Sequence, residues 1–93
     1  MDYEWDTTKA DTNFKKHGVS FEEAQTVFNN PLAIIFDDEF HSSLAEYREI
    51  IIGHSRQNRI LLVSFTERTQ AIRIISARPT TQREREDYES TSF

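Results

Sequence analysis

Three apolar segments joined by very short connections constrain the fold of this chain more than any other feature of its sequence. The segments cover residues 47–54, 59–67 and 71–78. Connections of three or four residues are too short for a crossover helix, so neighbouring segments must run antiparallel. The sequence therefore predicts a three-stranded meander.

A fourth apolar segment and the two ends of the chain complete the predicted architecture. Residues 32–36 form a short apolar run ahead of the meander, and residues 3–5 alternate aromatic and acidic side chains as an edge strand does. The predicted fold class is α+β: a short first strand and two N-terminal helices packed on a four-stranded antiparallel sheet, plus a C-terminal helix. Ninety-three residues suffice for one core, so residues 1–93 are expected to form a single domain.

Capping signals mark the two N-terminal helices. Asp6 is expected to cap a helix over residues 7–17, which Gly18 ends in the left-handed conformation. Ser20 and Glu23 have capping-box spacing at the start of the second helix. Apolar spacing predicts the following buried side chains: Phe14, Phe21, Ala24, Phe28, Ile51, Leu62, Val63 and Ile74.

The C-terminal helix is expected to begin with a second capping box, formed by Thr81 and Glu84, and to end near Ser90. Tyr88 is its only large hydrophobic side chain, so packing should hold it weakly. We expect this helix to be mobile in the free protein or docked on another chain.

Several classes of protein are disfavoured by composition. The chain has no cysteine, and no apolar run approaches the roughly 18 residues that cross a bilayer. The N-terminus is acidic rather than signal-like, so a cytoplasmic protein without a membrane partner is expected. Three histidines without ligand spacing predict no metal site, and two glycines cannot form a phosphate loop, so no cofactor is expected.

Charge is distributed unevenly along the chain, whose net charge is −5. Ten acids and all three lysines lie in residues 1–46, whereas all eight arginines and six acids lie in residues 47–93. Because guanidinium groups form forked contacts with phosphate or carboxylate, the second half is predicted to be the binding half. Composition alone leaves open that the arginines only decorate the exposed sides of strands.

The positions of three arginines can be read from strand alternation. Strand alternation places Arg73 on one face of the last strand, with Ile75, and Arg78 on the opposite face. Arg48 shares a face with Ile50. Each must meet an anion, form an internal salt bridge or extend to water. Arg78 ends the last strand, close to where Tyr88 follows, and is better placed for a ligand at the rim of the sheet.

Polar residues of the first helix form a further candidate surface. Lys9, Asn13 and Lys16 share one broad face, with His17 just beyond it. A solvated helix face explains these four residues equally well.

The motifs together resemble the BrnT family of ribonuclease toxins. The N-terminal signature is Trp5-Asp6-x-x-Lys9-x-x-x-Asn13-x-x-Lys16-His17-Gly18-Val19-Ser20-Phe21-Glu22-Glu23-Ala24, and later matches are Ile72-Arg73-Ile74-Ile75-Ser76-Ala77-Arg78 and Glu84-Arg85-x-x-Tyr88. The resemblance implies a RelE-like fold and a ribonuclease toxin of a type II toxin–antitoxin pair. It also implies a BrnA-like antitoxin with a ribbon-helix-helix domain, through which alone the toxin would be linked to DNA.

RelE-like cleavage needs no metal, because the ribose 2′-hydroxyl attacks the adjacent phosphate in line. The resemblance implies phosphate stabilisation by Arg73 and Arg78, with Arg48 in support. Tyr88 would stack on a base or assist proton transfer. His17 and Lys9 are the remaining acid/base candidates. We expect the three arginines to converge on one open concavity, with Tyr88 at its rim.

Two other functions compete with an active ribonuclease. A net charge of −5 opposes RNA binding, so the chain could be a weakly active or inactive toxin fold that serves mainly as antitoxin partner and co-repressor. The third possibility is a small scaffold domain without nucleic-acid contact.

Overall fold

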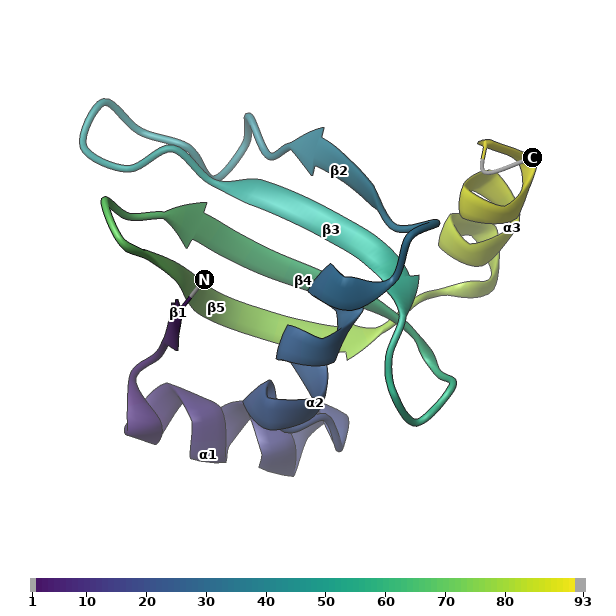
Figure 1. Cartoon of the computed structure of the whole chain (residues 1–93), viewed down its shortest axis with the longest axis horizontal. Helices are drawn as coiled ribbons and strands as arrows, with labels where there is room; N and C mark the ends of the chain where they lie inside the picture. Colours follow the sequence, from purple (N-terminus) through teal and green to yellow (C-terminus); the bar gives the residue numbers. More distant parts are fainter. Residues whose placement is uncertain (1, 92–93) are drawn as a thin grey trace.

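The computed structural model describes residues 2–91 as one curved five-stranded sheet with α1 and α2 on one side and α3 at the far end of the strands (Figure 1). The elements are β1 (Asp2–Glu4), α1 (Thr7–His17), α2 (Phe21–Thr26), the 3-10 turn η1 (Val27–Asn29), β2 (Ile34–Asp37), β3 (Glu49–His54), β4 (Ile60–Glu67), β5 (Ala71–Pro79) and α3 (Gln82–Thr91). Within the described residues, no helix is long and apolar enough to span a membrane.

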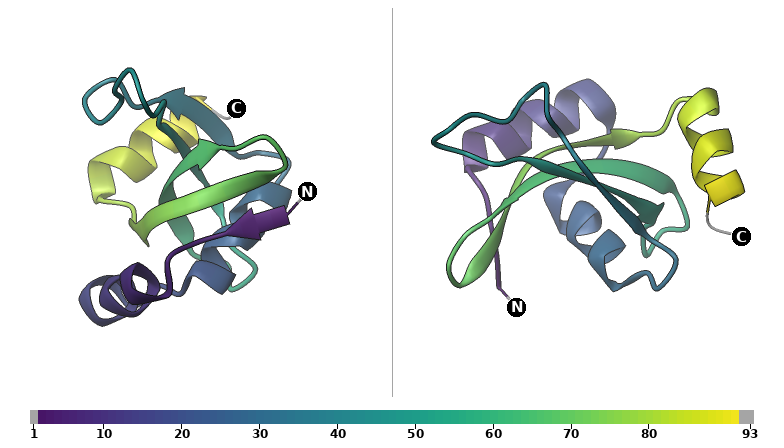
Figure 2. Two further views of the ribbon diagram at one scale, coloured as in Figure 1. Left: turned by 90° about the vertical axis from the view of Figure 1, so that its left-hand side faces the viewer. Right: turned by 90° about the horizontal axis from the view of Figure 1, so that it is seen from above.

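The sheet has the strand order β1-β5-β4-β3-β2. The predicted meander is confirmed, because β3, β4 and β5 are antiparallel neighbours, and β2 joins β3 antiparallel. The four predicted antiparallel strands are therefore present as β2–β5. The difference is that the predicted first strand, β1, belongs to the same sheet: it pairs parallel with the start of β5 and makes the sheet five-stranded and mixed (Figure 2). Parallel pairing between segments so far apart leaves no local turn signal in the sequence.

The predicted caps are present at both N-terminal helices. The Asp6 carboxylate accepts a hydrogen bond from the Lys9 N–H at 2.9 Å, and Gly18 ends α1 with a φ of 68°. The Ser20 hydroxyl accepts from the Glu23 N–H at 3.0 Å. Local sequence signals therefore set the start and end of α1 and the start of α2.

Hydrophobic side chains form one large cluster on the helix side of the sheet and a smaller one on the outer face, which is the face opposite α1 and α2. The buried members of the large cluster are Val19, Phe21, Ala24, Val27, Ile51, Leu61, Val63, Phe65, Ile72, Ile74 and Ala77. Ile52, Leu62 and Tyr88 are the buried members of the small cluster. Among the residues predicted to be buried, Phe28 is partly buried against the large cluster. The prediction that Phe14 is buried is wrong.

Phe14 is 52% exposed because Asn13, rather than Phe14, faces the sheet. The Asn13 amide donates to the carbonyl oxygens of Val19 at 3.0 Å and Ala77 at 2.8 Å. Its carbonyl oxygen accepts from the Ala77 N–H at 3.0 Å. Asn13 thus pairs with the edge of β5 beyond β1, much as another strand would, and holds α1 alongside that edge.

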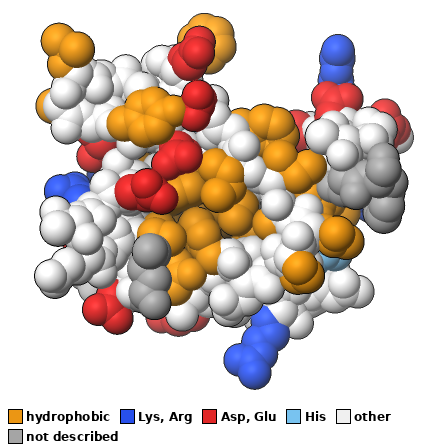
Figure 3. Space-filling view, turned by 45° about the horizontal axis from the view of Figure 1, so that its top comes forward, with side chains coloured by type: hydrophobic (Ala, Val, Ile, Leu, Met, Phe, Trp, Pro, Cys, Tyr) orange, Lys and Arg blue, Asp and Glu red, His pale blue; other side chains and the backbone are white. Residues whose placement is uncertain are grey.

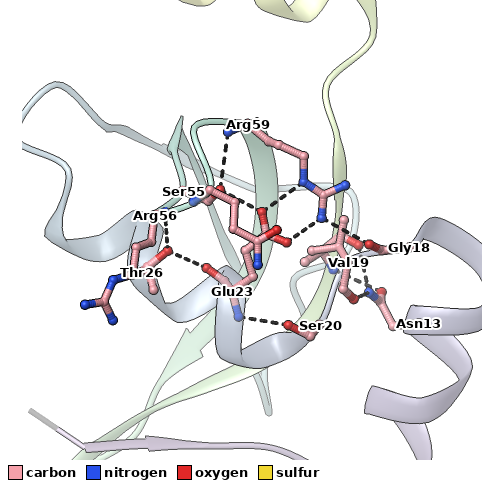
Figure 4. Close-up of polar contacts among 11 residues, drawn as sticks. Asn13, Gly18, Val19, Ser20, Glu23, Thr26, Ser55, Arg56 and Arg59 are labelled. Atoms are coloured by element: carbon pink, nitrogen blue, oxygen red, sulfur yellow. Dashed lines mark hydrogen bonds and ion pairs between the residues drawn. The ribbon is translucent and has the colours of Figure 1, made fainter.

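A buried carboxylate joins α2 to the β3–β4 turn (Figure 4). Glu23 accepts from the Ser55 hydroxyl at 2.7 Å and from Arg59 Nε at 2.9 Å, and its second oxygen accepts from the other side of the same guanidinium. Arg59 also donates to the Gly18 carbonyl oxygen at 3.0 Å, at the end of α1. These contacts tie α1, α2 and the turn together.

The outer edge strand β2 carries exposed apolar side chains. Ile35 and Phe36 are exposed, as are Leu32 before the strand and Tyr47 ahead of β3. Figure 3 shows hydrophobic side chains gathered in one patch with acidic side chains at its border. An edge strand with exposed hydrophobic side chains is a surface on which another chain can pair.

We expect Glu23→Gln to lower the free energy of unfolding by about 2 kcal/mol, because the Arg59 guanidinium and the Ser55 hydroxyl then lose their charged acceptor. This value is at the low end for a buried pair because Arg59 is partly exposed. Urea unfolding measures the change, and Glu22→Gln, on the exposed side of α2, is the matched control.

The same variant carries a pH signature. The hydrogen bond from Arg59 holds the pKa of Glu23 below its usual value of 4.5. The stabilisation is therefore complete above about pH 4.5 and lost as pH falls through the lower folded-state pKa. In Glu23→Gln the free energy of unfolding should therefore fall less steeply at acid pH than in the wild type. An equally steep fall in both proteins would contradict the role given to the carboxylate.

Candidate active site

The outer face of the sheet carries all three predicted site arginines. Arg73 lies between Ile72 and Ile74, which point to the helix side, and Arg78 pairs across β4 with Leu62 of the outer cluster. Arg48 precedes β3 in alternation with Ile50, which also packs on the outer cluster.

A β-bulge brings Arg73 and Arg78 onto the same face. Strict alternation predicts opposite faces for two residues five positions apart, and that face assignment is wrong. Ser64 pairs with Ser76 and the next residue of β4 pairs with Ile74, which leaves Ile75 as an extra residue. The bulge resets the alternation, so Ser76 and Arg78 join Arg73 on the outer face.

Each of the three arginines is paired with one carboxylate. Arg48 Nε lies 2.7 Å from a Glu46 oxygen, and Arg73 contacts Glu4 of β1 at 2.8 Å. Arg78 forms a fork with Glu84, with N–O distances of 2.7 and 2.8 Å. Carboxylates therefore already occupy contacts that suit phosphate oxygens.

The Arg78–Glu84 pair is the strongest of these contacts. Hydrogen bonding from Arg78 is the main cause that lowers the pKa of Glu84 to about 2, and the same bond raises the pKa of Arg78. Glu84 also accepts from the Thr81 N–H at 2.8 Å, while the Thr81 hydroxyl accepts from the Glu84 N–H at 3.2 Å. The predicted capping box of α3 is thus complete, and it holds Glu84 against Arg78.

The arginines share a face but occupy two positions on it. Arg73 pairs with Thr66, and Arg78 pairs with Leu62, four residues earlier on β4 and so about 13 Å away at the rise of a strand. Arg48 lies at the Thr66 end, where the Thr66 hydroxyl donates to the carbonyl oxygen of Tyr47 at 2.7 Å. The predicted convergence on a single concavity is therefore wrong in detail: one end holds Arg48 and Arg73, and the other holds Arg78.

Tyr88 is buried instead of lying at a rim. Its ring is 3% exposed and packs with Ile52 and Leu62, and its hydroxyl donates to the Leu32 carbonyl oxygen at 3.1 Å. Tyr88 therefore anchors α3 to the outer face. One aromatic side chain and the capping box thus hold α3 against the sheet, and its mobility in the free protein stays a prediction.

Lys9 and His17 lie on α1, which packs against β5. Both line a surface pocket of about 280 Å³ between α1 and β5. The charge of Lys9 contributes to lowering the pKa of Glu46, after the larger effect of Arg48. It also contributes, together with Arg73, to the lowered pKa of Asp6, whose main cause is the hydrogen bond from the Lys9 backbone. Lys9 is therefore close to the end of the outer face that holds Arg48 and Arg73.

Sequence reasoning missed three contributors to this region. Arg68 lies 3.8 Å from Glu46 and adds a cation at the same end. Asn13 is buried although its position suggested a solvated helix face. Ile75 gave no sign of a bulge, because an extra residue in a strand leaves no mark in an apolar run.

Comparison with known proteins gives the family. The model of "Ribonuclease toxin, BrnT, of type II toxin-antitoxin system" matches residues 5–84. The crystal structure of the Brucella abortus ribonuclease toxin BrnT superposes with a TM-score of 0.66 at 28% sequence identity, covering 88% of this chain and 99% of that one. No curated protein sequence matches the chain. The chain belongs to the BrnT family of ribonuclease toxins of type II toxin–antitoxin systems.

Proposed function

We propose that this protein is a metal-independent endoribonuclease that acts in the cytoplasm and inhibits growth by cleaving RNA. The observation that carries the proposal is the presence of Arg48, Arg73 and Arg78 on one face of the sheet, to which Ser76, in the same pocket as Lys9 and His17 of α1, also belongs. Guanidinium groups fixed on a rigid sheet can neutralise the charge that gathers on phosphoryl oxygens during cleavage.

The chemistry requires no group beyond those of the chain and the RNA. The ribose 2′-hydroxyl attacks the adjacent phosphorus, its proton leaves to a base, and the 5′-oxygen departs with a proton from an acid. Lys9 and His17, which line the pocket between α1 and β5, are the acid and base candidates. Tyr88 reaches RNA only when α3 moves, because its ring is buried.

RNA binding on this face has a cost that sets the activity of the toxin. Each arginine holds a carboxylate, so an RNA phosphate must displace Glu4, Glu46 or Glu84 from its partner. The separation of Arg78 from Arg48 and Arg73 fits contacts with different phosphates of one strand. The carboxylates preserve the arginine positions while the site is empty of RNA.

We propose that a BrnA-like antitoxin with a ribbon-helix-helix domain neutralises the toxin and supplies its only link to DNA. The exposed edge of β2, with Ile35 and Phe36, supports a protein partner. The carboxylate pairs favour a second candidate function: a toxin fold that is nearly inactive and serves mainly as antitoxin partner and co-repressor.

We expect Arg73→Ala to reduce RNA cleavage by about 100-fold or more, as removal of one donor to a developing oxyanion does. The Arg73–Glu4 pair is partly exposed, so the free energy of unfolding should change by about 1 kcal/mol at most. Cleavage of a labelled single-stranded RNA in excess EDTA measures both the activity and its independence from metal.

Arg83→Ala is the matched control, because Arg83 is exposed on α3 and forms no ion pair among the described residues. It should leave the rate unchanged. Cleavage that stops in EDTA and returns with Mg²⁺ would contradict the metal-independent mechanism. An absence of cleavage in wild type, together with tight antitoxin binding, would favour the second candidate function.

We expect Glu84→Gln to increase RNA cleavage about fivefold, because it removes the charged competitor for the Arg78 fork at a partly exposed site. The gain should be constant above pH 5, since the pKa of Glu84 is about 2 and the carboxylate is ionised throughout that range. Single-turnover rates at pH 5, 6.5 and 8 measure it.

Glu86→Gln controls for net charge, because Glu86 lies on the same helix and its side chain hydrogen-bonds only to Gln82 within the described residues. Equal gains for both variants would assign the effect to net charge. A loss of activity in Glu84→Gln would mean that Glu84 positions Arg78 for catalysis instead of competing with RNA.

A further inference from the structure

Two of the lysines and one histidine lie together without a carboxylate partner among the described residues. Six of the eight arginines have a carboxylate within 4.0 Å, whereas none of the lysines does within the described residues. Lys9, Lys16 and His17 all line the pocket between α1 and β5, and their side chains form no ion pair or hydrogen bond with residues 2–91. An anion can bind there without displacing a carboxylate.

The pocket is a consequence of the bulge and of Asn13. The extra residue of β5, Ile75, lines the pocket and provides an apolar surface, and Ser76 follows it. Asn13 holds α1 to Ala77 through hydrogen bonds of 2.8 and 3.0 Å and so fixes one wall relative to the other. The distance between the cations and the apolar surface is therefore set by the fold.

The lining matches the chemistry of one nucleotide. The pocket offers ammonium groups for a phosphate, hydroxyls of Thr8, Thr12 and Ser76 for polar groups of a ribose or base, and Ile75 for an apolar ring face. Its volume of about 280 Å³ is at the small end of ligand pockets. A bare phosphate would leave Ile75 and the hydroxyls without a role.

The position of the pocket favours RNA over an acidic peptide. Ser76 belongs both to the pocket lining and to the outer face, where it lies between Arg73 and Arg78 along β5. A single strand that contacts these arginines passes the opening of the pocket. An acidic peptide would need only the cations.

We propose that the pocket between α1 and β5 binds one nucleotide of the RNA, with its phosphate on Lys16 and Lys9 and its ribose and base against Ser76 and Ile75. This inference rests on the proposed function, since it adds a subsite next to the arginines. The pocket gives the toxin a position at which the identity of one base can be selected.

The test uses nucleoside 3′-monophosphates and the full chain in NMR titrations. The amide signals of Ile75, Ser76 and His17 should shift with at least one of the four nucleotides. Inorganic phosphate should shift His17 alone. Equal shifts with phosphate and with every nucleotide would overturn the proposal. Shifts of these signals with an acidic peptide such as oligoglutamate, and with none of the nucleotides, would overturn it as well.

A pair of neighbouring lysines provides the variant arm. Lys16→Ala should weaken binding of an uncleavable 2′-O-methyl oligonucleotide several-fold. The slope of log K against log salt concentration is negative, and the variant should make it less steep by about 0.7, the value for one lost single-strand phosphate contact. Lys15→Ala removes the same charge from a residue outside the pocket and should leave both unchanged. Equal effects of the two variants would overturn the proposal.

The two proposals fail in distinguishable ways. RNA cleavage with no nucleotide-induced shift at Ile75 would leave the ribonuclease intact and remove the subsite. Nucleotide binding in the pocket without any RNA cleavage would retain the subsite and contradict the proposed activity.

Discussion

The pairing of Asn13 with the edge of β5 is the contact on which the arrangement of this protein depends. β1 covers only the first part of that edge, so the N–H and carbonyl groups of Ala77 would otherwise be left without a strand partner. A single side-chain amide satisfies both, and a third hydrogen bond reaches Val19 at the start of the next element. Because Asn13 belongs to the helix that carries Lys9, Lys16 and His17, the same contact brings the cations of α1 to the arginines of β5.

The bulge at Ile75 is the second constraint, because it decides what the outer face of the sheet contains. Without it, Arg73 and Arg78 would lie on opposite faces, and one guanidinium would be directed into the apolar cluster beneath the helices. With it, both arginines face outward and each meets a carboxylate. The three outer-face arginines of this acidic chain are thus already paired, and in the proposed function RNA must compete with their carboxylates.

Local signals in the sequence predicted the fold well, and long-range contacts were where prediction failed. Capping residues and short connections gave α1, α3 and the meander, since each depends on residues close in the chain. The bulge lies between neighbouring strands, but its extra residue leaves no mark in an apolar run. The parallel pairing of β1 and the inward position of Asn13 depend on residues about 60 to 70 positions apart, such as Glu4 with Arg73. For the same reason the resemblance did not give the carboxylate partners of the three arginines, and it placed Tyr88 at a rim when packing buries it.

The central claim is that RNA phosphates take the place of carboxylates on the outer-face arginines. Arginine side-chain NMR tests it directly, by following the Nε–Hε signals while an uncleavable 2′-O-methyl RNA is added. The signals of Arg48, Arg73 and Arg78 should move together as RNA is added. That of Arg59, which is held by the buried Glu23 of α2, should stay in place. Movement of Arg56 or Arg83 with the three site arginines unchanged would contradict the account.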